Sequence, residues 1–344
     1  MKTGPAALIT GIFGQDGALL AELLLSKGYR VIGAHHSSVE TGSFRLQMLG
    51  IDHRVELIEC DVAKDGAVAE LLKTYKIDEF YNLAAQSFVG QSWDRPEATT
   101  SVNALAVLYI LEALRNLSPE TRFFQASSAE MFGNGSSKLK TEGTALNPCS
   151  PYAVAKAYGH HMTVNYRESH GLHASSGILF NHDSRLRSRE FVTRKITYGL
   201  AQIAVGFAGP LELGNIACRR DWGFAGEYVE AMWQMLQQPQ PDDYVIATGK
   251  AHSIRDFVEA TARVFDMEIE WSGSGLDEVG RDRATGRAVV VINDKFFRPA
   301  EVDILVGDAS KAQAALGWAS STDLDMLVAD MAMSDYNLLV KKAS

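Results

Sequence analysis

The stretch TGIFGQDG, Thr10–Gly17, directly follows the apolar run AALI and decides the fold. It places Gly11, Gly14 and Gly17 three residues apart, between an expected first strand and an expected first helix. Glycine has no Cβ atom, so it lets the backbone turn tightly and approach a ligand closely. Peptide N–H groups left bare at a helix N-terminus bind anions, and the best interpretation of this turn is a site for the pyrophosphate of a dinucleotide.

Short apolar runs alternate with helical patterns through the first half of the chain. The expected strands are PAALITG (5–11), YRVIGAH (29–35), RVELIECD (54–61), EFYNLAA (79–85), TRFFQASS (121–128) and HASSGILF (173–180). This βαβ alternation predicts an α/β fold with a doubly wound, parallel Rossmann sheet. The regular alternation of strand and helix patterns ends after Phe180, and glycine and charged residues become frequent from Ile269 to Ile292. These changes indicate a smaller domain or lid with a mobile loop.

These changes of pattern give soft domain boundaries. We expect a dinucleotide-binding Rossmann domain over residues 1–180 and about 225–249, because DDYVIATG (242–249) reads as a strand that returns to the main sheet. We expect a smaller, discontinuous C-terminal substrate domain over about 181–224 and 250–344.

Composition excludes several classes of protein. The 344 residues are 46% hydrophobic and 22% charged, as in an ordinary globular protein, and the net charge of -9 disfavours a nucleic-acid partner. The three cysteines are odd in number and far apart (Cys60, Cys149 and Cys218), so neither a disulfide framework nor a metal site is expected. No signal peptide and no apolar run near the roughly 20 residues of a membrane span are found. We therefore expect a cytoplasmic protein with no membrane partner.

The stretch SPYAVAKAY, Ser150–Tyr158, places Tyr152 and Lys156 four residues apart, on one face of an expected helix. A tyrosine with a pKa near 10 needs roughly 4 kcal/mol of differential stabilisation to lose its proton near pH 7. A lysine ammonium one turn away, with an oxidised nicotinamide, supplies such a field. Tyr152 would then move a hydroxyl proton while the nicotinamide takes a hydride. The alternative is an exposed Tyr and Lys with no chemical role.

A third signal is ASSAE, Ala126–Glu130, which follows an expected strand. Ser128 and Glu130 would lie beyond a carboxyl end of the sheet, where open α/β folds bind ligands. A hydroxyl orients a substrate oxygen, and a carboxylate removes a carbon-bound proton next to a new ketone. From spacing alone, Glu130 is equally well explained as a charge that stabilises a helix N-terminus.

Seven stretches together carry a family resemblance. They are TGIFGQDG, EFYNLAAQSFVGQSW, RFFQASSAEMFG, SPYAVAKAYGHHMTVNYRESHGLHASSGILFNH, FVTRKIT, RRDWGFAGEYVEAMWQMLQQ and FFRPAEVD. Across nearly the whole chain they resemble the GDP-mannose 4,6-dehydratases, which are extended short-chain dehydrogenase/reductases. NYRES, RRDWG and FRPAEVD are specific to that enzyme or its near relatives, whereas the Tyr152–Lys156 pattern marks the whole superfamily.

The resemblance implies an internal redox cycle with NADP. Hydride leaves C4 of the sugar as Tyr152 removes the C4 hydroxyl proton, while Lys156 holds the tyrosine and the nicotinamide ribose. Glu130 then removes the C5 proton and water leaves from C6, after which hydride returns to C6 and a proton to C5. The product is GDP-4-keto-6-deoxymannose, and the cofactor is regenerated. The threonine of the family's active site falls on Ser128.

The resemblance also assigns binding residues. The cofactor residues are Gly11, Gly14, Gln15, Asp16, Gly17, His36, Ser37, Asp61, Val62, Leu83, Ala84, Ala85, Ser87, Tyr152, Lys156, His182 and Arg187. The nucleotide-sugar residues are Ser87, Asn181, Lys195, Arg220 and Arg298. The two arginines in the second set suit a diphosphate, because each guanidinium is a rigid, permanently charged fork.

Three departures from the family pattern qualify this assignment. Serine replaces threonine at position 128 but keeps the hydroxyl. AHHSS has His35 and His36 where relatives carry an arginine pair for the 2′-phosphate of NADP, so Arg45 and Ser37 are possible substitutes and NAD remains an alternative. FNHDSRLRS (180–188) replaces the family's Glu, Pro and Gly with Asp, Arg and Ser, so a GDP-manno-heptose is an alternative substrate.

Other functions remain open from the sequence. A reductase or epimerase of the same fold is one alternative, and a nucleotide-sensing module without catalysis is another. The pairs His35–His36 and His160–His161 lack an obvious third ligand, so solvated or packed histidines are expected rather than a metal site. We expect a homodimer or homotetramer, because helices such as VLYILEAL and YAVAKAYGHHM are suited to the four-helix contact of the resembled family.

Overall fold

The computed structural model describes residues 4–36, 42–135, 139–206, 209–296 and 302–343. The chain forms two compact units. Unit 1 comprises residues 1–180, 225–247 and 307–319, and unit 2 comprises residues 181–224, 248–306 and 320–344. Residues 307–319, which we expected in the second domain, belong to unit 1, where Gly307 bridges to Lys140 and the indole of Trp318 donates to the carbonyl of Glu227 at 2.8 Å.

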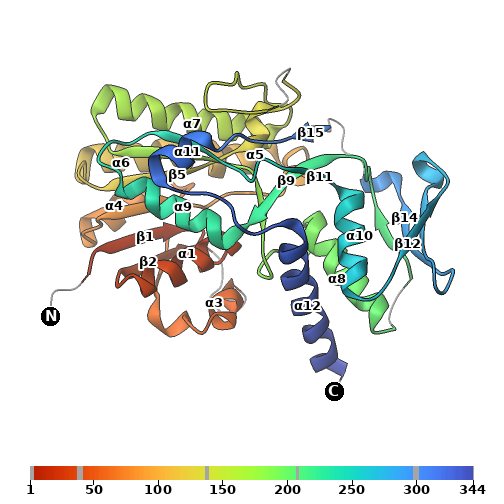
Figure 1. Cartoon of the computed structure of the whole chain (residues 1–344). Helices are drawn as coiled ribbons and strands as arrows, with labels where there is room; N and C mark the ends of the chain where they lie inside the picture. The colour runs from red at the N-terminus through yellow and green to blue at the C-terminus, as the bar shows by residue number, and fades with distance from the viewer. Residues whose placement is uncertain (1–3, 37–41, 136–138, 207–208, 297–301, 344) are drawn as a thin grey trace. The chain divides into compact units, whose positions relative to one another are not determined.

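Unit 1 is built on a seven-stranded sheet in the order β10-β6-β5-β4-β1-β2-β3 (Figure 1). Its strands are β1 (Ala6–Thr10), β2 (Arg30–His35), β3 (Glu56–Glu59), β4 (Glu79–Asn82), β5 (Arg122–Ser128), β6 (Ala174–Leu179) and β10 (Asp243–Ile246). All six pairings are parallel. The predicted doubly wound Rossmann sheet is therefore confirmed, and the strand order reverses between β1 and β4, where such sheets bind ligands.

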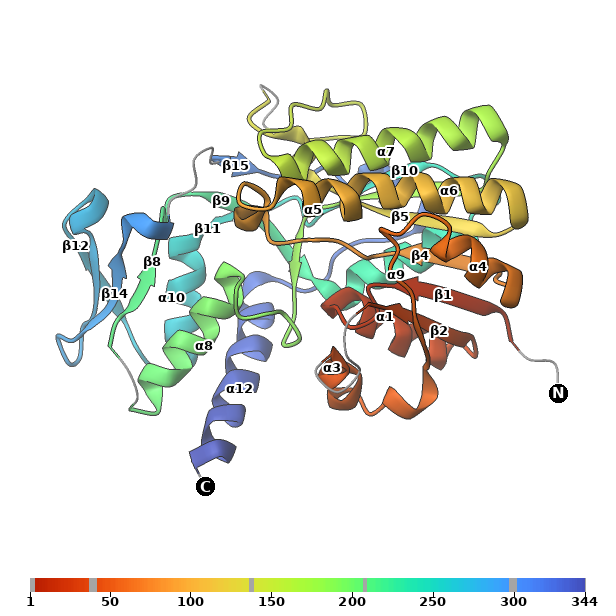
Figure 2. The same ribbon diagram turned by 180° about the vertical axis from the view of Figure 1, so that it is seen from behind.

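Helices cover both faces of this sheet (Figure 2). The longer ones are α1 (Gln15–Ser26), α4 (Ala67–Thr74), α6 (Ala106–Leu117), α7 (Pro151–His170) and α9 (Ala225–Gln237); the shorter ones are α3 (Phe44–Met48), α5 (Pro96–Thr100), the π-helical turn η3 (Ser101–Leu105) and α11 (Ser310–Leu316). A core of apolar side chains from β1, β2, β4 and β5 packs against α4 and α6, which buries the strands' continuous apolar runs. Single 3-10 turns are η1 (Asp52–Arg54), η2 (Val89–Ser92) and η4 (Ala129–Phe132).

Unit 2 holds two small sheets. One contains β11 (Ala251–Ser253), β9 (Arg219–Phe224), β15 (Ile304–Leu305) and β7 (Asn181–Asp183), and the other contains β12 (Ile269–Ser272), β13 (Val279–Asp282), β14 (Ala288–Ile292) and β8 (Leu211–Leu213). Its helices are α8 (Val192–Ala204), α10 (Ile254–Val264) and α12 (Leu324–Ala343), with 3-10 turns η5 (Gly275–Asp277) and η6 (Asp294–Phe296).

Trp222 and Phe257 stack edge to face in the core of unit 2, with ring centroids 5.2 Å apart. The expectation of a mobile loop over 269–292 is wrong, because these residues form the antiparallel strands β12, β13 and β14. No helix within the described part of the chain is long and apolar enough to cross a membrane.

Candidate active site

The glycine turn joins β1 to α1 as predicted. Gly11 has φ +71°, and a Cβ there would lie 2.8 Å from the backbone of Leu83 and Ala84, so only glycine fits. A Cβ on Gly17 would lie 2.3 Å from the carbonyl oxygen of Gly11. Gly14 is the N-cap of α1 and offers no side-chain oxygen to the first helical N–H groups. The turn is thus a cradle that side chains would fill, at a helix end suited to an anion.

A ladder of buried polar side chains links this turn to the neighbouring strands. Thr10 Oγ1 donates to Asn82 Oδ1 at 2.7 Å and accepts the backbone N–H groups of Leu83 and Ala84, each at 3.1 Å. Asn82 Nδ2 in turn donates to Gln125 Oε1 at 2.8 Å. These bonds were not predicted from the sequence, although a polar residue near the end of each apolar strand run was their signal.

The start of α7 positions the tyrosine and lysine. Ser150 caps the helix by accepting the Ala153 N–H at 3.1 Å, and Pro151 occupies the first helical position, where its missing N–H costs nothing. Tyr152 and Lys156 therefore lie in the first two turns and share a face, as predicted. Both are buried, with 8% and 4% of their surface exposed, so the interpretation as an exposed pair is wrong.

Lys156 is a buried cation held by a carbonyl. Its Nζ donates to the Ala126 carbonyl oxygen at 2.8 Å and lies 5.8 Å from the centre of the Tyr152 ring. Burial lowers the pKa of Lys156 from 10.5 to about 8, and the nearby carboxylate of Asp16 opposes that shift. The lysine remains mostly protonated at pH 7 and provides positive charge in a site of low polarity.

Ser128 and Glu130 lie at the carboxyl end of β5. Ser128 is the last residue of the strand, and its Oγ accepts the Glu130 N–H at 3.2 Å. This bond starts the short turn η4, on which Glu130 is half-buried. No described residue forms a hydrogen bond or ion pair with the Glu130 carboxylate, so it is available to accept a proton.

The other unit 1 residues assigned to the cofactor follow the same edge of the sheet. Asp61 and Val62 come after β3, while residues 83–85 and the exposed Ser87 come after β4. Gln15 and Asp16 open α1, where Gln15 Nε2 donates to Asp16 Oδ1 at 3.0 Å. Carboxyl ends of parallel strands meet at one edge, so the fold brings these residues to the side of the sheet that bears Gly11 and Ser128.

The segment expected to discriminate between NADP and NAD is partly described. His35 stacks on Phe13 of the glycine turn with ring centroids 5.0 Å apart, and His36 is exposed. Arg45 Nη1 donates to the Phe13 carbonyl oxygen at 2.8 Å, which places a guanidinium beside the turn. Ser37 lies outside the described residues.

The remaining residues assigned to the cofactor or to the nucleotide-sugar belong to unit 2. Asn181 and His182 lie on β7, opposite Trp222 and Gly223 of β9. Arg187 forms an ion pair with the buried Asp183 (Nε to Oδ1, 2.9 Å) and lies over a phenylalanine ring at 3.6 Å.

The two basic residues assigned to the nucleotide-sugar are partly or fully buried. Lys195 Nζ lies 3.2 Å from the centre of the Phe296 ring, and burial lowers its pKa. Arg220 lies on β9, and its Nη1 donates to the Val302 carbonyl oxygen at 2.6 Å. Arg298 lies outside the described residues. The sequence did not single out Arg194 and Asp335, whose buried ion pair (2.6 Å) joins α8 to α12.

Within the described ranges, no group of three or more His, Cys, Asp or Glu side chains is arranged to hold a metal ion. His160 is buried whereas His161 is exposed.

Comparison with known proteins gives consistent matches. The family model for GDP-mannose 4,6 dehydratase matches residues 8–331. A GDP-mannose 4,6 dehydratase of Drosophila melanogaster is 46% identical, over 97% of this chain and 87% of its own length. The enzyme of Sinorhizobium fredii is 45% identical, over 98% and 99%. A third relative, GDP-mannose 4,6-dehydratase sdnI of Sordaria araneosa, is 46% identical over 97% of this chain, which spans 61% of that longer protein.

Solved structures share the fold at lower identity. The dTDP-glucose 4,6-dehydratase of Bacillus anthracis, in complex with NAD, has a TM-score of 0.79 at 16% identity and covers 96% of both chains. RMD of Pseudomonas aeruginosa, complexed with NADPH, has a TM-score of 0.76 at 19% identity and covers 97% of this chain and 99% of its own. By its family model and its full-length relatives, the chain belongs to the GDP-mannose 4,6-dehydratase family, and dehydration of GDP-mannose is the function that these matches support.

Proposed function

We propose that Ser128, Glu130, Tyr152 and Lys156 catalyse the conversion of GDP-mannose to GDP-4-keto-6-deoxymannose, with NADP as the internal hydride carrier. The observation that carries this proposal is the buried Lys156, which bonds the Ala126 carbonyl oxygen beside Ser128 and shares a helix face with Tyr152. This observation supports the proposal that a cation, a phenol, a hydroxyl and a carboxylate act together at the carboxyl end of β5.

The residues present fit a dinucleotide. The Gly11–Gly17 turn leaves space that a Cβ would fill, and the uncapped N-terminus of α1 suits a pyrophosphate. Gly11, Gly14, Gln15, Asp16 and Gly17 would hold that group. When bound, the nicotinamide supplies the hydride acceptor for C4 and the hydride donor for C6.

The chain's own side chains move the protons. Tyr152, with its phenol acidified by the Lys156 ammonium, takes the proton of the C4 hydroxyl. Ser128 donates a hydrogen bond to the same oxygen and polarises the ketone that forms there. Glu130 then removes the C5 proton, which the ketone has made acidic, and passes it to the C6 hydroxyl, which leaves as water. When C6 is reduced, C5 takes back a proton, and Tyr152 holds the one that it took from the C4 hydroxyl. The overall change is the loss of one water from the sugar.

Cofactor identity rests on the segment after β2. We favour NADP, because the Arg45 guanidinium lies beside the glycine turn and the chain has His35 and His36, rather than Asp or Glu, at the end of β2. Fold relatives have been solved with NAD and with NADPH, so their cofactors do not decide between the two. His36, Ser37, Asp61, Val62, Leu83, Ala84, Ala85, Ser87, His182 and Arg187 complete the proposed cofactor set.

We assign the GDP part of the substrate to unit 2 residues Asn181, Lys195, Arg220 and Arg298, together with Ser87. Lys195 and Arg220 are cations that burial makes effective toward a diphosphate. A GDP-manno-heptose is the second candidate substrate, because Asp183, Arg185 and Ser188 replace the Glu, Pro and Gly of the resembled family in this segment.

We also propose that the chain forms a homo-oligomer and is cytoplasmic. The apolar side chains of Leu105, Val154 and Tyr158 are exposed on η3 and α7, which supports a homodimer or a homotetramer through these helices. A cytoplasmic location is supported by cysteines at positions 60, 149 and 218 that form no disulfide.

The test is to incubate the purified protein with GDP-mannose and either NADP+ or NAD+ and to follow the nucleotide-sugar by mass spectrometry. We expect GDP-mannose to lose one water without build-up of reduced cofactor. The Glu130→Gln and Tyr152→Phe variants should not dehydrate GDP-mannose. GDP-mannose that stays unchanged while cofactor is bound would point to the heptose. Consumption of added NADPH would instead indicate a reductase.

A further inference from the structure

His160 is a buried histidine that the proposed mechanism does not use. It lies on α7 one turn after Lys156 and two turns after Tyr152, so the three side chains share one side of the helix. Only 8% of its surface is exposed, whereas the adjacent His161 is exposed. A polar ring in this position must have a partner inside the fold.

Its partner is a residue between two parts of the active site. The Nδ1 atom of His160 lies 3.3 Å from Oγ of Ser127, and both groups are buried. Ser127 directly follows Ala126, whose carbonyl oxygen accepts the Lys156 ammonium at 2.8 Å, and directly precedes Ser128. The His160–Ser127 bond thus ties α7 to β5 one turn beyond the Lys156–Ala126 bond.

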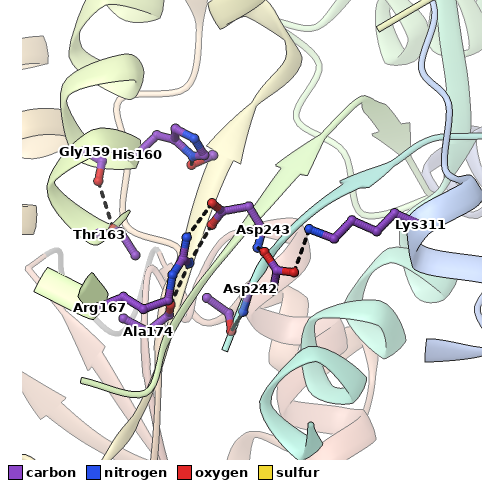
Figure 3. A network of polar contacts seen from close by, with 10 residues as sticks. Gly159, His160, Thr163, Arg167, Ala174, Asp242, Asp243 and Lys311 are labelled. Atoms are coloured by element: carbon purple, nitrogen blue, oxygen red, sulfur yellow. Dashed lines mark hydrogen bonds and ion pairs between the residues drawn. The ribbon is translucent and has the colours of Figure 1, made fainter. Parts of the chain in front are cut away.

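The surroundings favour a neutral imidazole that acts as a hydrogen-bonding group. Burial lowers the pKa of His160, the charges of His161 and Arg167 lower it further, and Asp243 opposes them. Asp243 is already engaged with Arg167 through two bonds of 2.9 and 2.7 Å. Figure 3 shows His160 projecting from α7 toward this ion pair.

We propose that His160 is a positioning residue for catalysis, which holds the end of β5 against α7 through Ser127 so that Lys156 stays bonded to Ala126 and close to Tyr152. This rests on the proposed roles of Tyr152 and Lys156. The two side-chain bonds hold α7 against the end of β5 at two points, whereas the Lys156 bond alone holds it at one.

Without the second bond, the Lys156 charge would act less well on the Tyr152 phenol. The pKa of Tyr152 would then rise, and the acidic limb of the kcat profile would move to higher pH, because the base form of tyrosine is the active one. Substrate affinity would change little, since no substrate contact is removed.

The experiment compares His160→Leu, which keeps the bulk but loses the bond, with His160→Asn, whose amide can still reach Ser127. His161→Asn is the matched control on the exposed side of the same helix. For His160→Leu we expect kcat to fall about tenfold, as for the loss of one buried hydrogen bond, with KM within about twofold of wild type. The acidic limb should move upward, and His160→Asn should recover most of the activity and the wild-type limb. Ser127→Ala should reproduce the leucine variant, and the double variant should lose little more.

Wild-type kcat and an unmoved limb in His160→Leu would overturn the inference. A similar loss in both His160 variants, with lower melting temperatures and an unmoved limb, would also overturn it, because the role would then be structural only. Failure of the proposed function looks different: the wild type would not dehydrate GDP-mannose, or Tyr152→Phe would remain active, and the inference would then fall with it.

Discussion

Replacing Lys156 with methionine is expected to stabilise the fold at neutral pH and to abolish turnover. The lysine is almost fully buried, and its burial is costly because a charged ammonium leaves water. Methionine has similar length and flexibility but no charge, so it fits the same space and removes that cost. Stability and activity would therefore change in opposite directions at one position.

The magnitude follows from the lowered pKa. A fall from 10.5 to about 8 corresponds to about 3 kcal/mol at about 1.4 kcal/mol per pKa unit. The variant also loses the bond to the Ala126 carbonyl oxygen, worth about 1 kcal/mol, but Gln125 Nε2 still donates to that oxygen at 3.1 Å. The expected net gain is about 2 kcal/mol at pH 7.

The pH dependence gives a second check. Because the pKa of Lys156 is lower in the folded protein, the unfolded chain binds more protons between about pH 8 and 10.5. Wild-type stability from this group therefore rises with pH through that window, while the methionine variant lacks this contribution. The advantage of the variant should shrink by about 1.4 kcal/mol per pH unit above pH 8 and nearly vanish by about pH 9.5.

The assay is thermal melting of the wild type and the Lys156→Met variant at pH 7 and at about pH 9.5. The protein is first freed of nucleotide, because a bound ligand adds its own binding free energy to the stability. We expect the variant to melt roughly 3 °C higher at pH 7, because unfolding a chain of 344 residues carries an entropy of about 0.7 kcal/mol/K. Lys73→Met, at an exposed position on α4, is the control and should melt within about 1 °C of wild type. A variant that melts at or below the wild-type temperature at pH 7, or a gap that does not narrow with pH, would refute the reasoning.

Three further predictions use separate parts of the structure. Gly11→Ala should destabilise the fold by more than about 2 kcal/mol and abolish nucleotide binding in a fluorescence titration, whereas Gly28→Ala, with positive φ but open space, should cost only about 1 kcal/mol. Arg194→Met should lower the free energy of unfolding by about 3 kcal/mol at pH 7, measured by urea denaturation. The loss should be smaller at pH 5, because burial raises the pKa of the Asp335 carboxyl, which can then take up a proton instead of remaining an unpaired charge. Arg45→Gln should weaken NADP+ binding about tenfold more than NAD+ binding by calorimetry; equal weakening would remove Arg45 from the 2′-phosphate site.

The central sheet could be predicted because most of its strands, unlike the edge strand β3, are buried on both faces. Such strands appear as continuous apolar runs bounded by polar residues, and the segment around 243–246 has this pattern even though it is separated from β6 by a long insertion. The glycine turn was equally clear, since the close approach of Gly11 to residues 83–84 admits no other residue.

The polar connections could not be predicted in the same way. The bonds of Thr10 to Asn82 and of His160 to Ser127 depend on which strands become neighbours, and strand order is a property of the whole fold. The spacing of four residues puts His160 on the Lys156 side of α7, but the spacing does not show whether that side is buried; the packing of α7 buries His160 and leaves His161 exposed. Strands β12–β14 were not predicted, because glycine and charged residues interrupt the apolar pattern of short antiparallel strands that bury only one face.

The interleaving of the two units sets the order in which the molecule is completed during synthesis. Strand β10 ends at Ile246, 66 residues after residue 180, so at about 5–20 residues per second β6 waits roughly 3–13 seconds for its neighbouring strand. Helix α11 of unit 1 follows only after most of unit 2 has been made. Until β10 is made, β6 is an open edge strand, a template for pairing with other chains. A fragment ending at residue 180 should therefore aggregate, and a soluble version of unit 1 requires residues 225–247 and 307–319 to be joined to it by designed linkers.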